Sequence, residues 1–154
     1  MRILFVCTGN ICRSPTAEAV MRARLTASGL DHPVDSAGIQ GFHSGEPPHA
    51  PAIRAAAARG YDLLSLRARR LERSDFRRFD LLLGMDRTHL ERMRRLAVAG
   101  PGRIGLFLDH APWLEEREVP DPYYGGSAEF EHALDLIEAG CDGLIAALRE
   151  GRLG

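Results

Sequence analysis

The chain has 154 residues, a formal net charge of −1 and a hydrophobic content of 45%. A chain of this length can bury about two-thirds of its unfolded surface in one core, so we expect a single domain spanning residues 1–154. The charges are spread without a basic patch or an acidic tail, and the opening apolar run is too short to cross a bilayer. We therefore expect a cytoplasmic protein with no nucleic-acid or membrane partner, and we expect it to be a monomer.

Short apolar runs alternate with segments of helical periodicity in the first third of the chain. Residues 1–6 are typical of a strand buried on both faces. Residues 17–28 carry apolar side chains at helical spacing and end at Gly29, which predicts a helix. A second strand is predicted over 34–38, and the glycines and prolines of 39–48 predict a loop.

The same alternation continues to the end of the chain. The predicted elements are a helix over 50–59, a helical turn at 74–76, strands over 80–85 and 103–108, a long loop over 109–126, and helices over 87–97 and 127–149. Asp86 is placed to cap its helix, in which Glu91 and Arg95 are spaced to pair. Gly140 and Gly143 leave open whether the last helix is continuous. Strands alternating with helices favour a three-layer α/β fold with a parallel sheet, whose ligands lie beyond the carboxyl ends of the strands.

The turn between the first strand and the first helix carries the residues best suited to chemistry. Gly9 and Asn10 tolerate unusual backbone angles, so the N–H groups of this loop can converge on an anion at a helix start. Arg13 adds a guanidinium that can bind two oxygens at once. The positive field favours the thiolate form of Cys7, and Ser14 can hydrogen-bond that sulfur. The loop predicts a sulfur nucleophile facing a phosphate-like group; the alternative is that Cys7 is an inert buried thiol.

Residues 6–15, Val-Cys-Thr-Gly-Asn-Ile-Cys-Arg-Ser-Pro, resemble the phosphate-binding loop of the low-molecular-weight protein tyrosine phosphatases. The resemblance extends to an Asp-Pro-Tyr motif at Asp121 and to the last helix. It implies a doubly wound four-stranded sheet with strand order 2-1-3-4. It also implies that substrate phosphate is bound by Thr8, Gly9, Asn10, Ile11, Cys12 and Ser14, together with Arg13.

The resemblance further implies a reaction in two steps on a phosphotyrosine-containing protein. Cys7 would form a phosphocysteine while Asp121 protonates the leaving phenol, and Asp121 would then activate the water that releases inorganic phosphate. Asp109 is the fallback acid. No cofactor is implied, and because no Cys/His grouping has zinc-ligand spacing, we expect no metal.

Several residues around the loop have an interpretation from the same resemblance. Ser36 matches a serine that hydrogen-bonds the loop asparagine, whereas a histidine that often joins this network is replaced near Leu66. Cys12 is either a packing residue or the partner of Cys7 in a reversible disulfide, the role that the resemblance favours. An aromatic wall for the phenyl ring, or simple packing of the loops, is expected of Phe42, Tyr123 and Tyr124. Structural roles are expected of Glu18, Asp80 and Asp86, and surface or packing roles of the other histidines.

Three further functions are compatible with parts of this pattern. Arsenate reductases share the loop type but need further cysteines, and the only cysteine outside the loop is Cys141. Protein arginine phosphatases tend to carry Thr where Ile11 stands, and an apolar Ile11 favours a phenyl phosphate over a guanidinium. A non-enzymatic phosphate-binding module would keep Arg13 but would have no need of Cys7 or Asp121.

Overall fold

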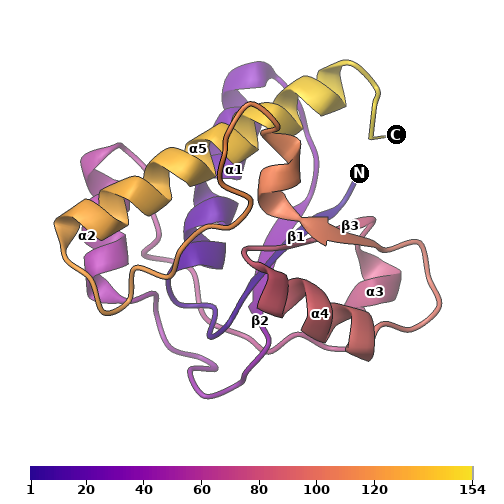
Figure 1. Cartoon of the computed structure of the whole chain (residues 1–154), viewed down its shortest axis with the longest axis horizontal. Coiled ribbons are helices and arrows are strands. Elements are labelled where there is room, and N and C mark those ends of the chain that lie inside the picture. The colour runs from indigo at the N-terminus through magenta and orange to yellow at the C-terminus, as the bar shows by residue number, and fades with distance from the viewer. Residues whose placement is uncertain (154) are drawn as a thin grey trace.

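A computed structural model describes residues 1–153 of the chain, and its strands and helices alternate as the sequence predicts. In chain order the elements are β1 (Ile3–Cys7), α1 (Arg13–Ser28), β2 (Val34–Gly38), α2 (Ala50–Ala58), α3 (Asp75–Arg78), β3 (Leu81–Gly84), α4 (Arg87–Leu96), β4 (Arg103–Leu106), the 3-10 turn η1 (Phe107–His110) and α5 (Ser127–Arg149) (Figure 1). The predicted pairing of Glu91 with Arg95 is present at 2.8 Å.

The four strands form one parallel sheet in the order β2-β1-β3-β4. Every residue of the central strand β1 is buried, and its side chains alternate between two cores. Ile3 and Phe5 pack in the core with α1, α2 and α5, whereas Leu4 and Val6 pack in the core with α3 and α4. Helices therefore cover both faces of the sheet, as Figure 1 shows. The three-layer α/β fold and the strand order are confirmed.

The strand order places the loop after β1 at a recognisable ligand-binding position. The chain leaves β1 toward β2 on one side and later returns to β3 on the other side. In doubly wound sheets, ligands bind at this reversal, beyond the carboxyl ends of the strands. Cys7, the last residue of β1, lies in register with Gly38, the last residue of β2. The loop over residues 8–12 thus occupies the expected crevice.

Several predicted boundaries differ from the structure by one or more residues, and two of these differences concern the pocket and the core. Helix α1 begins at Arg13, four residues before the predicted start at 17, so Arg13 lies in its first turn. The strand predicted over 103–108 ends at Leu106, and η1 follows it. The reason is tertiary packing, because the ring of Phe107 turns into the core and contacts Phe5 edge to face, with centroids 5.2 Å apart.

The last helix, α5, is continuous despite its two interior glycines. A Cβ atom at Gly140 would lie 2.5 Å from the ring of Phe107, and one at Gly143 would lie 1.7 Å from the main-chain oxygen of His110. Both distances are far below van der Waals contact. The glycines therefore allow η1 to pack directly on α5, which outweighs their poor helix propensity.

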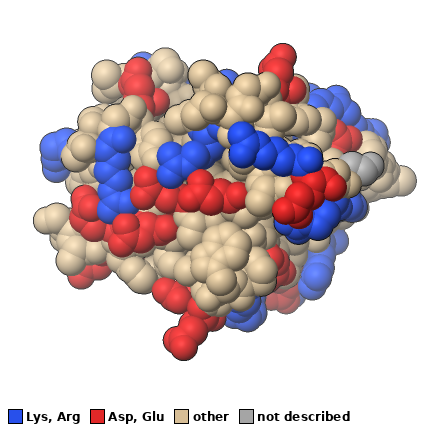
Figure 2. Space-filling view, turned by 90° about the horizontal axis from the view of Figure 1, so that it is seen from above, with Lys and Arg blue, Asp and Glu red and all other residues tan. Residues whose placement is uncertain are grey.

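Acidic side chains on the outer face of α5 pair with arginines of neighbouring elements. Arg59, which follows α2, reaches Glu131 and Glu138, and Arg24 of α1 reaches Glu138 and Asp142. Figure 2 shows acidic and basic side chains next to one another on one face of the molecule. Exposed pairs of this kind each contribute at most about 1 kcal/mol. None of the helices within residues 1–153 is long and apolar enough to span a membrane.

Replacing Gly143 tests the packing of η1 on α5. Gly143→Ala should lower the free energy of unfolding by about 3 kcal/mol, because the new methyl group overlaps the carbonyl oxygen of His110. Urea denaturation with an unchanged m value measures this loss. Gly105→Ala is the matched control, since a Cβ there lies no closer than 3.9 Å to a neighbour, and it should be nearly neutral. A Gly143→Ala variant as stable as the wild type would contradict the close packing.

Candidate active site

Cys7 lies at the end of β1 with its sulfur against a buried hydroxyl. Its Sγ atom is 2.9 Å from Ser14 Oγ, in the first turn of α1. Ser14 Oγ accepts a hydrogen bond from Asn10 Nδ2 at 2.8 Å, so its own hydrogen is available to the sulfur. Donation to sulfur stabilises a thiolate more than a thiol, because hydrogen bonds to the charged form are the stronger ones. The structure thus brings Cys7 and Ser14 together as the sequence predicts.

The loop after Cys7 turns its carbonyl groups away from the pocket. The carbonyl oxygens of Cys7, Thr8 and Ile11 accept hydrogen bonds from residues 39, 40 and 49. There is no cis peptide bond in the described residues, and a trans unit points its N–H opposite to its C=O. The N–H groups of Thr8, Gly9 and Cys12 therefore face the other way, toward the pocket that these residues line. This arrangement is a nest of donors suited to a phosphate-like anion.

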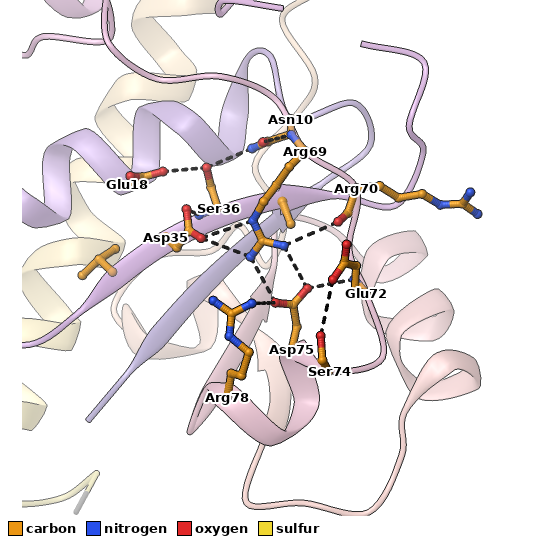
Figure 3. Close-up of polar contacts among 12 residues, drawn as sticks. Asn10, Glu18, Asp35, Ser36, Arg69, Arg70, Glu72, Ser74, Asp75 and Arg78 are labelled. Carbon is orange, nitrogen blue, oxygen red and sulfur yellow. Dashed lines mark hydrogen bonds and ion pairs between the residues drawn. The ribbon is translucent and has the colours of Figure 1, made fainter. Parts of the chain in front are cut away.

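Asn10 holds the curvature of the loop. It has a φ of 58°, in the left-handed region, and is the one non-glycine residue within residues 1–153 with a positive φ. Its Nδ2 donates to Ser36 Oγ at 2.9 Å as well as to Ser14, and its Oδ1 accepts the main-chain N–H of Arg69 at 3.0 Å. Ser36 Oγ in turn donates to Glu18 at 2.7 Å, as Figure 3 shows. Ser36 thus contacts the loop asparagine as predicted.

This network is complete although Leu66 stands where the resemblance implies a histidine. Glu18 is paired within α1 with Arg22, whose Nη2 lies 2.7 Å from Glu18 Oε2. Burial raises the pKa of Glu18, and the bonds from Ser36 and Arg22 oppose that rise. No buried side-chain nitrogen or oxygen in the described part of the chain lacks a hydrogen-bond partner.

The side chain of Arg69 fixes the segment whose main chain holds Asn10. Its guanidinium bonds Asp75 at 3.0 and 3.1 Å and lies 3.1 Å from Asp35 of β2. Asp75 is completely buried and also accepts the main-chain N–H of Glu72 (Figure 3). Removing one partner of a buried, hydrogen-bonded pair is costly, so this contact restrains the position of Arg69.

Arg13 is almost fully buried, and the two ends of its guanidinium have different surroundings. Nη1 donates to Asp86 Oδ2 and to the carbonyl oxygen of Val119, both at 2.9 Å. Nη2 lies 3.5 Å from Thr8 Oγ1 and 3.6 Å from Asp121 Oδ2. Nη1 is therefore anchored to protein, while Nη2 lies on the side of the pocket.

A pocket of about 200 Å³ opens above the loop. It is lined by Cys7, Thr8, Gly9, Ile11, Cys12, Arg13, Gln40, His43, Asp121, Tyr123 and Tyr124. Asp121 is half-exposed at its edge, and its Oδ1 accepts the main-chain N–H of Tyr123 at 3.1 Å. The fallback acid, Asp109, lies 3.5 Å from Arg117 instead and is not among the lining residues.

The aromatic rim differs from the predicted one at Phe42. Tyr123 stacks on His49, with ring centroids 4.4 Å apart, and meets Tyr124 edge to face. Phe42 is 83% exposed and does not line the pocket. The neighbouring His43 lines it instead, because its ring packs so closely on Gly9 that a Cβ there would be 3.0 Å from His43 Cδ2.

The three cysteines are unpaired. Burial, followed by the nearby charges of Cys7 and Asp121, raises the pKa of Cys12 to about 12. Cys12 is therefore a thiol at neutral pH, and its disulfide with Cys7 stays a prediction. Cys141 is fully buried, with its sulfur 3.8 Å from the carbonyl oxygen of Ala17. Residues 1–153 contain no group of three or more metal-ligating side chains.

Besides the lining residues Gln40 and His43, sequence reasoning missed two residues that hold the loop in place. Gly38 lets the loop pass close to β2, because a Cβ there would lie 2.9 Å from the carbonyl oxygen of Thr8. The sequence could have indicated this role, because Gly38 ends a predicted strand, where a glycine often marks the close approach of another part of the backbone. His89, in the first turn of α4, contacts Thr8 Oγ1 through Nε2 at 2.9 Å and accepts the Asp86 main-chain N–H at Nδ1. Its signal is the third position after the capping residue Asp86.

The fold and this pocket define a doubly wound α/β protein whose pocket is lined by the loop between its first strand and first helix. The sequence profile described as Low molecular weight phosphotyrosine protein phosphatase matches residues 2–153, and the chain belongs to this family. The chain is thus a hydrolase of the protein-tyrosine-phosphatase class.

Individual relatives and solved structures are similar to this chain in sequence or in fold. A low molecular weight protein-tyrosine-phosphatase of Streptomyces coelicolor is 45% identical over 155 residues, covering 97% of this chain and 94% of the relative. The crystal structure of a protein tyrosine phosphatase from Entamoeba histolytica superimposes with a TM-score of 0.93 at 35% identity, covering 99% of both chains. A drosophila arginine phosphatase superimposes with a TM-score of 0.92 at 28% identity, covering 97% of this chain and 98% of that protein.

The buried His89 predicts a pH dependence of stability. Burial lowers its pKa to about 4, against the opposing charge of Asp86, whereas the ordinary value is 6.5. Between these values the unfolded chain binds more protons, so the contribution of His89 is present above pH 6.5 and is lost as the pH falls toward 4. The difference in unfolding free energy between wild type and His89→Gln should therefore decrease as the pH falls from 6.5 to 4. An NMR titration of His89 with a midpoint near 6.5 would contradict the prediction.

Proposed function

We propose that the chain hydrolyses phosphotyrosine in protein substrates through a phosphocysteine on Cys7. One observation carries the proposal: the Cys7 sulfur, the inward N–H groups, Arg13 and the Asp121 carboxyl line a single pocket. A sulfur nucleophile, an anion cradle and a proton donor are the groups that this reaction needs.

In the first step, the Cys7 thiolate attacks phosphorus. An S–P bond forms and the bond between phosphorus and the tyrosyl oxygen breaks, while Asp121 gives its proton to the leaving oxygen. The loop N–H groups and Arg13 Nη2 bind the non-bridging oxygens, which carry the charge of the transition state.

In the second step, water attacks the phosphocysteine. Asp121, now a carboxylate, accepts a proton from the water, and the S–P bond breaks to give inorganic phosphate and the thiolate. The Ser14 hydroxyl, 2.9 Å from the sulfur, stabilises that departing thiolate. No cofactor takes part in either step.

The walls of the pocket support an aromatic substrate. Tyr123, Tyr124 and the apolar Ile11 line it, so a phenyl ring meets apolar surface as its phosphate reaches the loop. Phosphoarginine hydrolysis is the second candidate, because a drosophila arginine phosphatase shares the fold. The charged guanidinium of phosphoarginine would meet the side chain of Ile11, which offers it no hydrogen bond.

Arsenate reduction and simple phosphate binding fit the site less well. Arsenate reduction requires a further cysteine outside the loop that can reach the site, and Cys141 is fully buried and does not line the pocket. A non-enzymatic phosphate-binding module would not require Asp121 at the rim or a hydroxyl bonded to the Cys7 sulfur.

Comparing substrates side by side tests the proposed specificity. Peptides carrying phosphotyrosine should be hydrolysed faster than the same peptides carrying phosphoserine or phosphoarginine, because only the first presents a phenyl ring to the rim. Steady-state kcat/KM measures the ranking. The Cys7→Ser variant is the control and should bind inorganic phosphate without turnover. A Cys7→Ser enzyme with undiminished activity would exclude the phosphocysteine intermediate. A preference for phosphoarginine peptides would show that phosphoarginine, and not phosphotyrosine, is the substrate.

The role of Asp121 is tested through the leaving group. Asp121→Asn should lower kcat/KM for phosphotyrosine by about 10²- to 10⁴-fold, the usual contribution of a general acid. The loss should be smaller for an aryl phosphate whose phenol is more acidic, since that oxygen leaves without a proton. Asp109→Asn is the matched control and should retain wild-type rates. If Asp121→Asn lowers kcat/KM equally for good and poor leaving groups, Asp121 is not the general acid.

A further inference from the structure

Thr8 differs from the other loop residues that line the pocket. The described loop residues that line the pocket are Cys7, Thr8, Gly9, Ile11, Cys12 and Arg13, and of these only Thr8 has a side-chain hydroxyl. The resemblance assigns phosphate binding to the loop as a whole and gives the Thr8 side chain no separate part. What its hydroxyl can do depends on His89, whose ring nitrogen Nε2 lies 2.9 Å from Thr8 Oγ1.

The contacts of His89 fix which of its nitrogens carries the hydrogen. Its Nδ1 receives the main-chain N–H of Asp86 at 3.1 Å, so Nδ1 must present a lone pair. Asp86 Oδ1 also lies 3.2 Å from Nδ1, but a hydrogen on Nδ1 would face the hydrogen of the Asp86 main-chain N–H and abolish that bond. The ring is almost completely buried, and burial lowers its pKa to about 4, so it is neutral at pH 7. A neutral ring with a lone pair on Nδ1 carries its hydrogen on Nε2.

The hydrogen on Nε2 decides the direction of the Thr8 hydroxyl. His89 donates to Thr8 Oγ1, and Arg13 Nη2, which is also only a donor, lies 3.5 Å from the same oxygen. A hydroxyl oxygen can accept two hydrogen bonds and donate one. Since both neighbours donate, the hydrogen of Thr8 is not used on either and is free for a group in the pocket.

We propose that the Thr8 hydroxyl donates a hydrogen bond to the phosphoryl group, in addition to the main-chain N–H of the loop, and that His89 is the positioning residue that orients this hydroxyl. The ligand is a tetrahedral oxyanion, to which Thr8 adds one side-chain donor beside the loop amides and Arg13. This inference rests on the proposed phosphatase reaction and extends it. A hydrogen bond to a charged acceptor corresponds to about 10- to 100-fold in affinity.

Binding of inorganic phosphate to the whole chain, measured by titration calorimetry, tests the role of Thr8. Thr8→Val keeps the shape of the side chain but removes the hydroxyl, and it should weaken phosphate binding by about 10-fold or more. Thr8→Ser is the matched control and should retain wild-type affinity. Wild-type affinity in Thr8→Val would overturn the proposal, because Thr8 would then serve only as an acceptor for His89.

A double-mutant cycle tests whether His89 acts through Thr8. His89→Leu should weaken phosphate binding in the wild-type background and should have no further effect in the Thr8→Val background. Equal losses in both backgrounds would mean that His89 acts by general stabilisation of the site. Imidazole ¹⁵N NMR supplies an independent readout, since a hydrogen found on Nδ1 would also overturn the inference.

Phosphate binding is measured without turnover, so this inference and the proposed function can fail separately. Phosphotyrosine hydrolysis with unchanged phosphate affinity in Thr8→Val would remove the role of Thr8 and leave the reaction intact. If Thr8→Val lowers phosphate affinity but the wild-type chain hydrolyses no aryl phosphate, the role of Thr8 in anion binding stands and the proposed reaction is wrong.

Discussion

The shape of the pocket depends on Asn10 remaining in the left-handed backbone region. A non-glycine residue in that region costs on the order of 1–3 kcal/mol, although asparagine tolerates it better than most. The side chain of Asn10 makes hydrogen bonds with Ser14, Ser36 and the main chain of Arg69, each contributing about 0.5–1.5 kcal/mol. Together these bonds outweigh the strain. Glycine would adopt the same angles without strain but would leave the loop without this anchor.

The anchor itself is held by a segment far away in the sequence. Arg69 presents its main-chain N–H to Asn10 because its guanidinium is fixed by Asp35 and the buried Asp75. A buried ion pair is weak support for stability, since desolvation offsets much of the attraction. Its directional bonds do restrict where Arg69 can lie. The loop thus keeps its curvature although Leu66 offers no hydrogen bond at the position where the resemblance implies a histidine.

The loop and the order of elements could be predicted because they are encoded locally. The conformation of the loop depends on Gly9 and Asn10, and its positive potential depends on the adjacent helix N-terminus, so both follow from neighbouring residues. Apolar runs in the same way indicate the buried strands. Contacts between distant segments could not be predicted in the same way. His89 lies 81 positions after Thr8, and its neutral ring is defined only by burial. The exposure of Phe42 and the place of His43 in the pocket lining could not be predicted, because an irregular turn has no side-chain period. Gly143 left the continuity of the last helix open in the sequence. The reason for this glycine is the carbonyl group of His110, which packs against it from a distant turn and could not be predicted.

Arg13 shows how the fold accommodates a cation where the positive end of a helix dipole opposes it by roughly 0.3–1 kcal/mol. The bonds from Nη1 to Asp86 and to the carbonyl oxygen of Val119 offset this repulsion and leave Nη2 on the pocket side, 3.6 Å from Asp121. In the proposed reaction, a phosphoryl group that enters the loop competes with Asp121 for Nη2, and as a doubly charged anion it is the stronger partner. Asp121 stays at the rim because its Oδ1 accepts the Tyr123 N–H, and the leaving oxygen must lie there once phosphorus faces the Cys7 sulfur. Anion binding would therefore separate the acid from the cation at the moment when a proton is needed.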